Sequence, residues 1–265
     1  MISNKINLLF LLLLTSVFAQ QKITVEAIYT GQFQAKGMVE LQSMKNTNQY
    51  TVLNFDQASR SLQIDVFDFA TLKKVNTLIE TKNQSKLADG IDSYTFSSDE
   101  KMILIANNTN QIYRYSFSAD YFLYNLETKE LTKILEQVQE PFFSPDGKKI
   151  AYVKENNIYI YDVASKTNSQ ITTDGKKNEI INGITDWVYE EEFAFVRAFD
   201  WSKDSKKVAY IRFDESQIPE FSMSVFAKDL YPKIETFKYP KAGEKNSLVS
   251  LHLYTVDSKK KKKVD

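Results

Sequence analysis

Three consecutive glutamates, Glu190, Glu191 and Glu192, stand in the segment "TDWVYEEEF" at residues 185–193. Adjacent carboxylates repel one another, so such a run is stable either on a solvated surface or against a positive charge supplied by the fold or by a ligand. Neighbouring side chains of a helix diverge by about 100°. The run therefore indicates either an exposed helix face or a cation site, and it leaves open which two of the three carboxylates would converge.

Residues for covalent catalysis are missing from the sequence. A serine hydrolase of the α/β type needs a G-x-S-x-G turn and a histidine base, but no two of the seven glycines stand four residues apart. The single histidine, His252, lies in a strand-like alternating segment, where a structural role is expected. The sequence has no cysteine, which excludes thiolate metal sites and disulfides. We expect no catalytic residue, no metal site and no cofactor in this chain.

The composition is that of a globular protein without nucleic-acid-binding character. Hydrophobic residues make up 43% and charged residues 26%, and 34 Lys+Arg balance 34 Asp+Glu. The concentrated basic run from Lys259 to Lys263 follows the strand-like segment "LHLYTVD", so we expect it to form a solvated turn. Nucleic acid is therefore not an expected partner.

The first residues have the pattern of a secretory signal peptide. Lys5 precedes an apolar run from Leu8 to Leu14, and Val17-Phe18-Ala19 provides a signal-peptidase cleavage site. The run is shorter than the roughly 20 apolar residues that span a bilayer. We expect residues 1–19 to be a signal peptide, no stable membrane span after cleavage, and a periplasmic or extracellular protein of a bacterium.

Export makes a prediction about the mature amino terminus. Cleavage after Ala19 should leave Gln20 as the first residue of the exported protein. Mass spectrometry of the amino terminus from the native host measures this directly. If the protein isolated from the soluble exported fraction began at Met1, this prediction would be wrong. A cleavage site one or two residues away from Ala19 would still agree with export.

Internal repeats predict the architecture. The segments "YTFSSDEKMILIAN" from Tyr94, "PFFSPDGKKIAYVK" from Pro141 and "FDWSKDSKKVAYIR" from Phe199 share an aromatic-Ser-x-Asp turn before an apolar strand, with anchoring aromatics 47 and 58 residues apart. A tyrosine-rich strand follows each hairpin, at Asp120, Asn156 and Leu251. Multi-stranded repeats of about 40 to 50 residues are typical of β-propeller blades. A β-sandwich with similar hairpins is the alternative.

Three segments carry a resemblance to a known family. "NGITDWVYEEEFAF" resembles the double-glutamate helix of the dipeptidyl peptidase IV family, which are prolyl oligopeptidase-type serine peptidases. "YRYSFSADYFLYNLETKEL" from Tyr113 resembles the arginine-bearing blade of that family, and "IRFDESQIPEFSM" with "YPKIETFKYPKAGEKN" resembles its next two segments. The resemblance extends from about Lys22 to the end of the chain.

The resemblance implies roles for four residues and a substrate. Glu191 and Glu192 would bind the ammonium group of a peptide with a free amino terminus, with Glu190 in a supporting position. Arg114 would donate hydrogen bonds to a carbonyl or carboxylate of the same peptide. The implied activity of the complete enzyme is release of amino-terminal dipeptides, Xaa-Pro or Xaa-Ala.

It also implies a domain organisation. Residues 20–44 would pack on a hydrolase domain that this chain lacks, and residues 45–265 would form an all-β partial propeller, about half of an eight-bladed ring. The α/β-hydrolase domain follows the propeller in the family, so we expect this chain to be inactive by itself. The segment from Phe226 to Tyr239 resembles an arm that contributes to a homodimer.

Two other functions are compatible with the sequence. One is a non-catalytic propeller of the TolB type that binds proteins, because S-P-D-G turns are common to both groups. The other is a tripeptide-releasing relative, against which the paired glutamates argue because a second carboxylate shortens the space for substrate. An in-frame G-x-S-x-G after Asp265 would favour the peptidase, and an early stop codon would favour the binding protein.

Overall fold

The computed structural model of the chain describes residues 22–35, 37 and 40–264. The expected signal peptide and its cleavage site lie outside these residues and stay predictions. No helix in the described ranges is long and apolar enough to cross a membrane. The chain divides into two units between Glu40 and Leu41. The smaller unit contains the short helix α2 (Val25–Tyr29), where the N-cap Thr24 accepts a hydrogen bond from the Ala27 backbone N–H at 3.1 Å.

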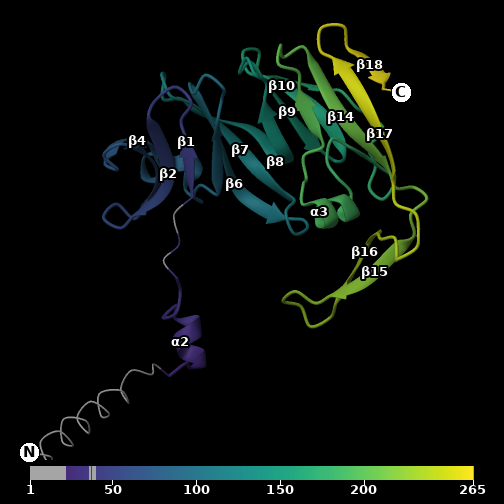
Figure 1. Cartoon of the computed structure of the whole chain (residues 1–265), viewed down its shortest axis with the longest axis horizontal. Helices are drawn as coiled ribbons and strands as arrows, with labels where there is room; N and C mark the ends of the chain where they lie inside the picture. The colour runs from purple at the N-terminus through teal and green to yellow at the C-terminus, as the bar shows by residue number, and fades with distance from the viewer. Residues whose placement is uncertain (1–21, 36, 38–39, 265) are drawn as a thin grey trace, which may run out of the picture. The chain divides into compact units, whose positions relative to one another are not determined.

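The larger unit is built from antiparallel sheets that follow one another in chain order (Figure 1). The first sheet has the order β1 (Leu41–Ser43), β2 (Gln49–Asp56), β3 (Ser61–Asp68), β4 (Lys74–Glu80). Two 3-10 turns follow it, η1 (Thr81–Asn83) and η2 (Ser85–Leu87). The second sheet contains β5 (Ser93–Phe96), β6 (Met102–Gln111), β7 (Phe117–Asn125), β8 (Leu131–Phe143), β9 (Lys149–Lys154), β10 (Asn157–Asp162) and β11 (Thr167–Gln170).

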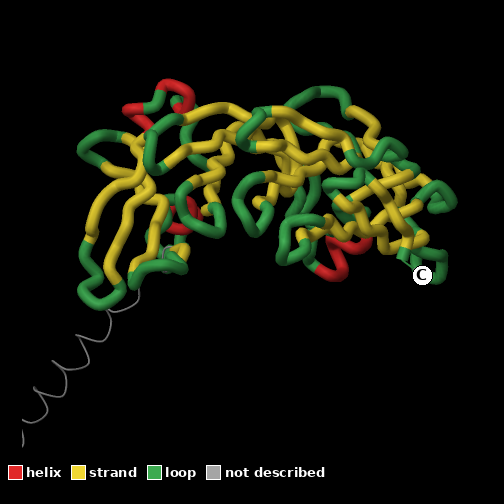
Figure 2. The backbone as a smooth tube through the Cα atoms, turned by 90° about the horizontal axis from the view of Figure 1, so that it is seen from above, coloured by secondary structure: helices red, strands yellow, loops and turns green. Residues whose placement is uncertain are grey.

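The third sheet carries two insertions. Its strands are β12 (Ile180–Asn182), β13 (Phe199–Trp201), β14 (Lys207–Asp214), β17 (Leu248–Thr255) and β18 (Lys260–Lys263). Helix α3 (Trp187–Phe193) lies between β12 and β13, and the hairpin of β15 (Glu220–Val225) and β16 (Lys233–Lys238) lies between β14 and β17. Figure 2 shows that the row of sheets is open, with the first and last sheets apart.

One long strand belongs to two blades. The first part of β8 pairs with β7 as far as Val138, and from Gln139 the strand pairs with β9. Gln137 and Glu140 have positive φ values of 47° and 51° at this point, which bend the strand as it changes partner. The seven-stranded sheet is therefore two four-stranded blades that share β8.

The repeats form the predicted turns. Phe96, Phe143 and Trp201 each end a strand, and the next strand begins after the turn. The serine hydroxyl of each turn donates to the aspartate two residues later, at 2.7 Å in the first and 2.6 Å in the other two. These short side chains satisfy the backbone of a tight turn, which explains the recurrence of Ser-x-Asp.

The core consists of three apolar clusters, each between neighbouring blades. Strand β6 illustrates the arrangement. Ile103 and Ile105 contribute to the cluster shared with the blade of β1 to β4, and Leu104 and Ala106 contribute to the cluster shared with the blade of β8 to β11. Because side chains alternate across a strand, a blade buried on both faces needs an uninterrupted apolar run. This requirement explains the sequence "ILIA" in β6.

The predicted arm from Phe226 to Tyr239 spans the tip of the β15–β16 hairpin and all of β16. Its tip is apolar and exposed, with Phe226 55%, Leu230 84% and Tyr231 79% accessible. Exposed apolar side chains at this density are suited to association. A part for the arm in dimer contacts stays a prediction.

Candidate binding site at helix α3

Helix α3 is fixed at both ends and by the segment before it. The Asp186 side chain caps the helix by accepting from the Tyr189 backbone N–H at 2.9 Å, and Ala194 ends it in the left-handed conformation with φ 54°. Gly183 leads into the helix with φ +79°, and a Cβ there would lie 2.7 Å from the Ile158 side chain. The glycine is therefore required by conformation and by space.

The three glutamates occupy three different environments. Glu190 is 1% exposed, the Glu191 side chain is 17% exposed, and Glu192 is exposed to solvent. This divergence is what the helical rotation between neighbouring residues requires. The run "EEE" is thus not one solvated face, because its first member is buried.

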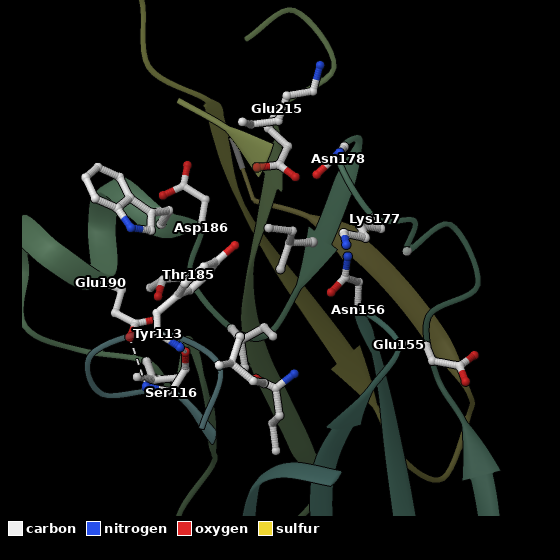
Figure 3. A pocket seen from close by; sticks show the side chains of 18 of the residues that line it. Tyr113, Ser116, Glu155, Asn156, Lys177, Asn178, Thr185, Asp186, Glu190 and Glu215 are labelled. Atoms are coloured by element: carbon white, nitrogen blue, oxygen red, sulfur yellow. Dashed lines mark hydrogen bonds between the residues drawn. The ribbon is translucent and has the colours of Figure 1, made fainter. Parts of the chain in front are cut away.

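Glu190 binds a loop from another blade. Its Oε1 accepts the backbone N–H groups of Tyr115 at 2.8 Å and Ser116 at 2.9 Å. Figure 3 shows Glu190 beside Ser116. The loop connects β6 to β7, and its ends are joined by the hydrogen bond from Ile112 N–H to the Ser116 carbonyl at 2.9 Å. A buried carboxylate that accepts two N–H groups is a strong, charge-assisted contact. Glu190 therefore positions the loop that carries Arg114.

Arg114, in the loop between β6 and β7, forms an ion pair with Glu191 of α3. The Arg114 Nε lies 2.9 Å from Glu191 Oε2, and the Arg114 side chain is 66% exposed. An ion pair of such exposure is worth roughly 0 to 1 kcal/mol, so a ligand can exchange into it at little cost. The Glu192 carboxylate is exposed to solvent and forms no ion pair with any residue that the structure describes.

The structure brings together three of the four site residues that the sequence singled out, Arg114, Glu190 and Glu191. Arg114 contacts Glu191 directly, Glu190 holds the Arg114 loop, and Glu192 follows on the same helix. His252 lies apart from them in β17, where its ring stacks on Tyr210 at 5.3 Å between centroids. Burial and the nearby Arg212 lower the pKa of His252, so its environment is that of a packed neutral ring.

Aromatic contacts tie the β15–β16 hairpin to the site. Trp187 of α3 lies 4.8 Å from Tyr239 and 6.3 Å from Phe237 between ring centroids, and Tyr113 lies 6.4 Å from Phe237. Such pairs stabilise by about 0.5 to 1.5 kcal/mol beyond their burial. The hairpin, the helix and the Arg114 loop therefore form one packed group.

Sequence patterns did not identify the charged cavity beside α3. It has a volume of about 520 Å³ and is lined by residues including Tyr113, Asp186, Trp187, Glu215 and Lys238 (Figure 3). Burial, then the nearby Asp186, raises the pKa of Glu215 to about 7. Burial, then the charges of Glu215 and Glu190, raises the pKa of Tyr113 to about 12. An aspartate directly before an apolar helical segment was a signal for Asp186, whereas Glu215 had none.

Known proteins resemble this chain along most of its length. The family "Dipeptidyl peptidase IV (DPP IV) N-terminal region" matches residues 97–265. The prolyl endopeptidase FAP of Mus musculus is 34% identical over 189 residues, which cover 70% of this chain and 25% of that protein. The inactive dipeptidyl peptidase 10 of Mus musculus is 34% identical over 194 residues, which cover 68% and 24%.

A solved structure shares the fold. The crystal structure of dipeptidyl peptidase 4 from Porphyromonas gingivalis superposes with a TM-score of 0.84 at 37% identity, over 93% of this chain and 35% of that chain. This likeness confirms the prediction that the chain forms the propeller portion of a dipeptidyl peptidase IV-type fold. The chain spans about a quarter of the length of the curated relatives it matches.

Proposed function

This chain belongs to the dipeptidyl peptidase IV family, and from that premise we propose that it supplies the substrate-binding surface of an exported serine exopeptidase. In this proposal the complete enzyme releases dipeptides of the Xaa-Pro or Xaa-Ala type from peptides with a free amino terminus. The observation that carries it is the Arg114–Glu191 ion pair at 2.9 Å beside an unpaired Glu192 among the described residues.

The chemistry of the site suits a peptide amino terminus. An α-amino group titrates at roughly 7.7 to 8.0, so at neutral pH the ligand is largely cationic. The ammonium group of the peptide replaces the exposed Arg114 as the ion-pair partner of Glu191, and it binds Glu191 and Glu192 together. The Arg114 guanidinium is then free to donate to a peptide carbonyl, which suits its planar array of donors.

Binding the terminus also sets the length of the product. A two-residue segment spans at most about 7 Å, so a fixed ammonium presents the second peptide bond at a constant distance. The sequence has no G-x-S-x-G, so hydrolysis of that bond belongs to the remainder of the enzyme. This chain contributes recognition and orientation of the substrate.

Acetylation of the substrate tests the proposal. The full-length protein should cleave an Xaa-Pro chromogenic peptide and process its N-acetylated form roughly thirtyfold to several-thousandfold more slowly in kcat/KM, because the acetyl group removes the charge that the glutamates bind. Steady-state kinetics give the ratio, and mass spectrometry of the products distinguishes release of dipeptides from release of tripeptides. Equal turnover of the two substrates would overturn the proposal.

A non-catalytic binding protein is the second candidate. One relative is named inactive dipeptidyl peptidase 10, so a similar region also occurs in a protein called inactive. A fluorophosphonate probe that labels reactive serines separates the candidates. Labelling of the full-length protein supports the peptidase, and absence of labelling together with absence of turnover supports the binding protein.

A further inference from the structure

The cavity beside α3 is distinct from the site formed by Arg114, Glu191 and Glu192, none of which lines it. Glu215 directly follows β14, lines this cavity and is 6% exposed. Its backbone is fixed on both sides, because its N–H donates to the Glu179 carbonyl at 2.8 Å and its carbonyl accepts from the Ile218 N–H at 2.9 Å. Figure 3 shows the Glu215 and Asp186 carboxylates facing the same space.

No side chain in the described part of the chain neutralises Glu215. The Lys238 ammonium, in the lining of the cavity, donates to the Ile218 carbonyl at 2.8 Å and lies 3.7 Å from Glu220 Oε1. Asp186 has partners of its own, the Tyr189 N–H and the Ser247 hydroxyl. Buried carboxylates are ordinarily paired. Glu215 is therefore a buried acid that faces a cavity without a side-chain counter-ion.

The lining matches one chemical class of ligand. Two of the lining residues, Tyr113 and Trp187, are aromatic, and aromatic rings attract cations. Aliphatic side chains complete the wall and suit a hydrocarbon stem: Ile112, Ile181, Ile184 and Val196. The volume of about 520 Å³ is within the usual range for small-molecule sites. A metal ion is not favoured, because no group of three or more His, Cys, Asp or Glu that could hold one occurs in the described residues.

We propose that this cavity is a second binding site, for small organic cations with an ammonium or guanidinium group on an aliphatic stem, and that Glu215 is the counter-ion of the bound group. Such a group occurs on free alkylamines and on lysine or arginine side chains. The aliphatic wall holds the stem, and Asp186 adds a second negative charge near the cationic end.

Proton linkage distinguishes this site from a general affinity for cations. Burial, then the nearby Asp186, raises the pKa of Glu215 to about 7, and Lys238 and a hydrogen bond from the Asn178 backbone N–H oppose the rise. The other titratable residues that line the cavity are Tyr113, Glu155, Lys176, Lys177 and Glu190. Below pH 7 the bound cation must displace a proton from Glu215, so affinity should fall by about tenfold per pH unit. Between pH 7 and the pKa of an alkylamine, near 10.4, affinity should be constant.

The test is titration calorimetry of the full-length protein with n-butylamine at pH 8, in the millimolar range that so small a ligand can reach. Glu215→Gln should weaken binding by about tenfold or more, whereas Glu220→Gln, an exposed glutamate beside Lys238, should not. Binding of n-butylamine to the cavity should persist in Glu192→Gln, which distinguishes the cavity from the proposed peptide site. N-acetyl-lysine amide in place of butylamine tests whether a peptide side chain is an equivalent source of the cation.

Folding of the decisive variant is checked in the same preparation. Because the folded-state pKa of Glu215 lies above its ordinary value, ionisation at pH 8 disfavours the fold, so Glu215→Gln should melt no lower than the wild type at that pH. Loss of binding in a variant with an unchanged or raised Tm supports the proposal. Unchanged affinity in Glu215→Gln, equal binding of n-butanol, or no binding by the wild type would each overturn it.

Discussion

Replacing either Glu191 or Glu192 with glutamine is expected to lower kcat/KM of the full-length protein for an Xaa-Pro dipeptide substrate by roughly thirtyfold to several-thousandfold. Glutamine keeps the size of the side chain and removes the charge. Loss of one partner of a desolvated, hydrogen-bonded charge pair costs about 2 to 5 kcal/mol, and each 1.4 kcal/mol is about a factor of ten. The loss arises with substrate bound, when the peptide excludes water from the carboxylates.

The same substitutions should hardly affect stability. In the described part of the chain Glu191 is paired with Arg114, whose side chain is 66% exposed, and exposed ion pairs contribute about 0 to 1 kcal/mol. Steady-state kinetics and a thermal melt of each variant therefore separate binding from folding. Glu130→Gln is a control for loss of an ion pair outside the site, because Glu130 lies 3.8 Å from Lys166 in a pair whose two side chains are each 64% exposed. Full activity in both glutamine variants would show that the two residues do not bind substrate.

Replacing Glu190 should have the opposite signature, a loss of stability first. Glu190→Ala leaves the N–H groups of Tyr115 and Ser116 without their acceptor in a buried position. An unsatisfied buried group costs about 1 to 3 kcal/mol, so we expect the free energy of unfolding to fall by about 2 to 5 kcal/mol. Activity should fall too, because the loop that these contacts hold carries Arg114. Urea denaturation and kinetics of the same preparation measure both effects.

Glu192 provides the matched control. Glu192→Ala removes a carboxylate two positions along the same helix, but that side chain is solvent-exposed, so its stability should change by about 0.5 kcal/mol or less. Glu190→Gln should recover part of the stability, since its amide oxygen can still accept a hydrogen bond, although without the charge. Equal unfolding midpoints for Glu190→Ala and Glu192→Ala would contradict a positioning role for Glu190.

Local patterns predicted the strands and their turns because the forces that set them are local. The Ser-x-Asp turns at Ser97, Ser144 and Ser202 satisfy their own backbone within a few residues, so their repetition shows the period of the blades directly. Alternation and apolar runs, as in β6, follow from side chains that point to opposite faces of a strand. The shared strand β8 was not predictable, since the change of partner at Val138 and Gln139 depends on positive φ values within an apparently regular strand.

The sequence by itself determined that the chain is built from blade-like β repeats, with a run of three carboxylates and no G-x-S-x-G nucleophile motif. Only the tertiary structure decided how the three carboxylates divide: Glu190 is buried against the Tyr115–Ser116 backbone, Glu191 is paired with Arg114, and Glu192 is exposed. It also placed Glu215 in a cavity beside α3. The reason is physical: periodicity and turn chemistry act between near neighbours, whereas burial and charge pairing depend on segments some 75 residues apart that meet only when the blades pack.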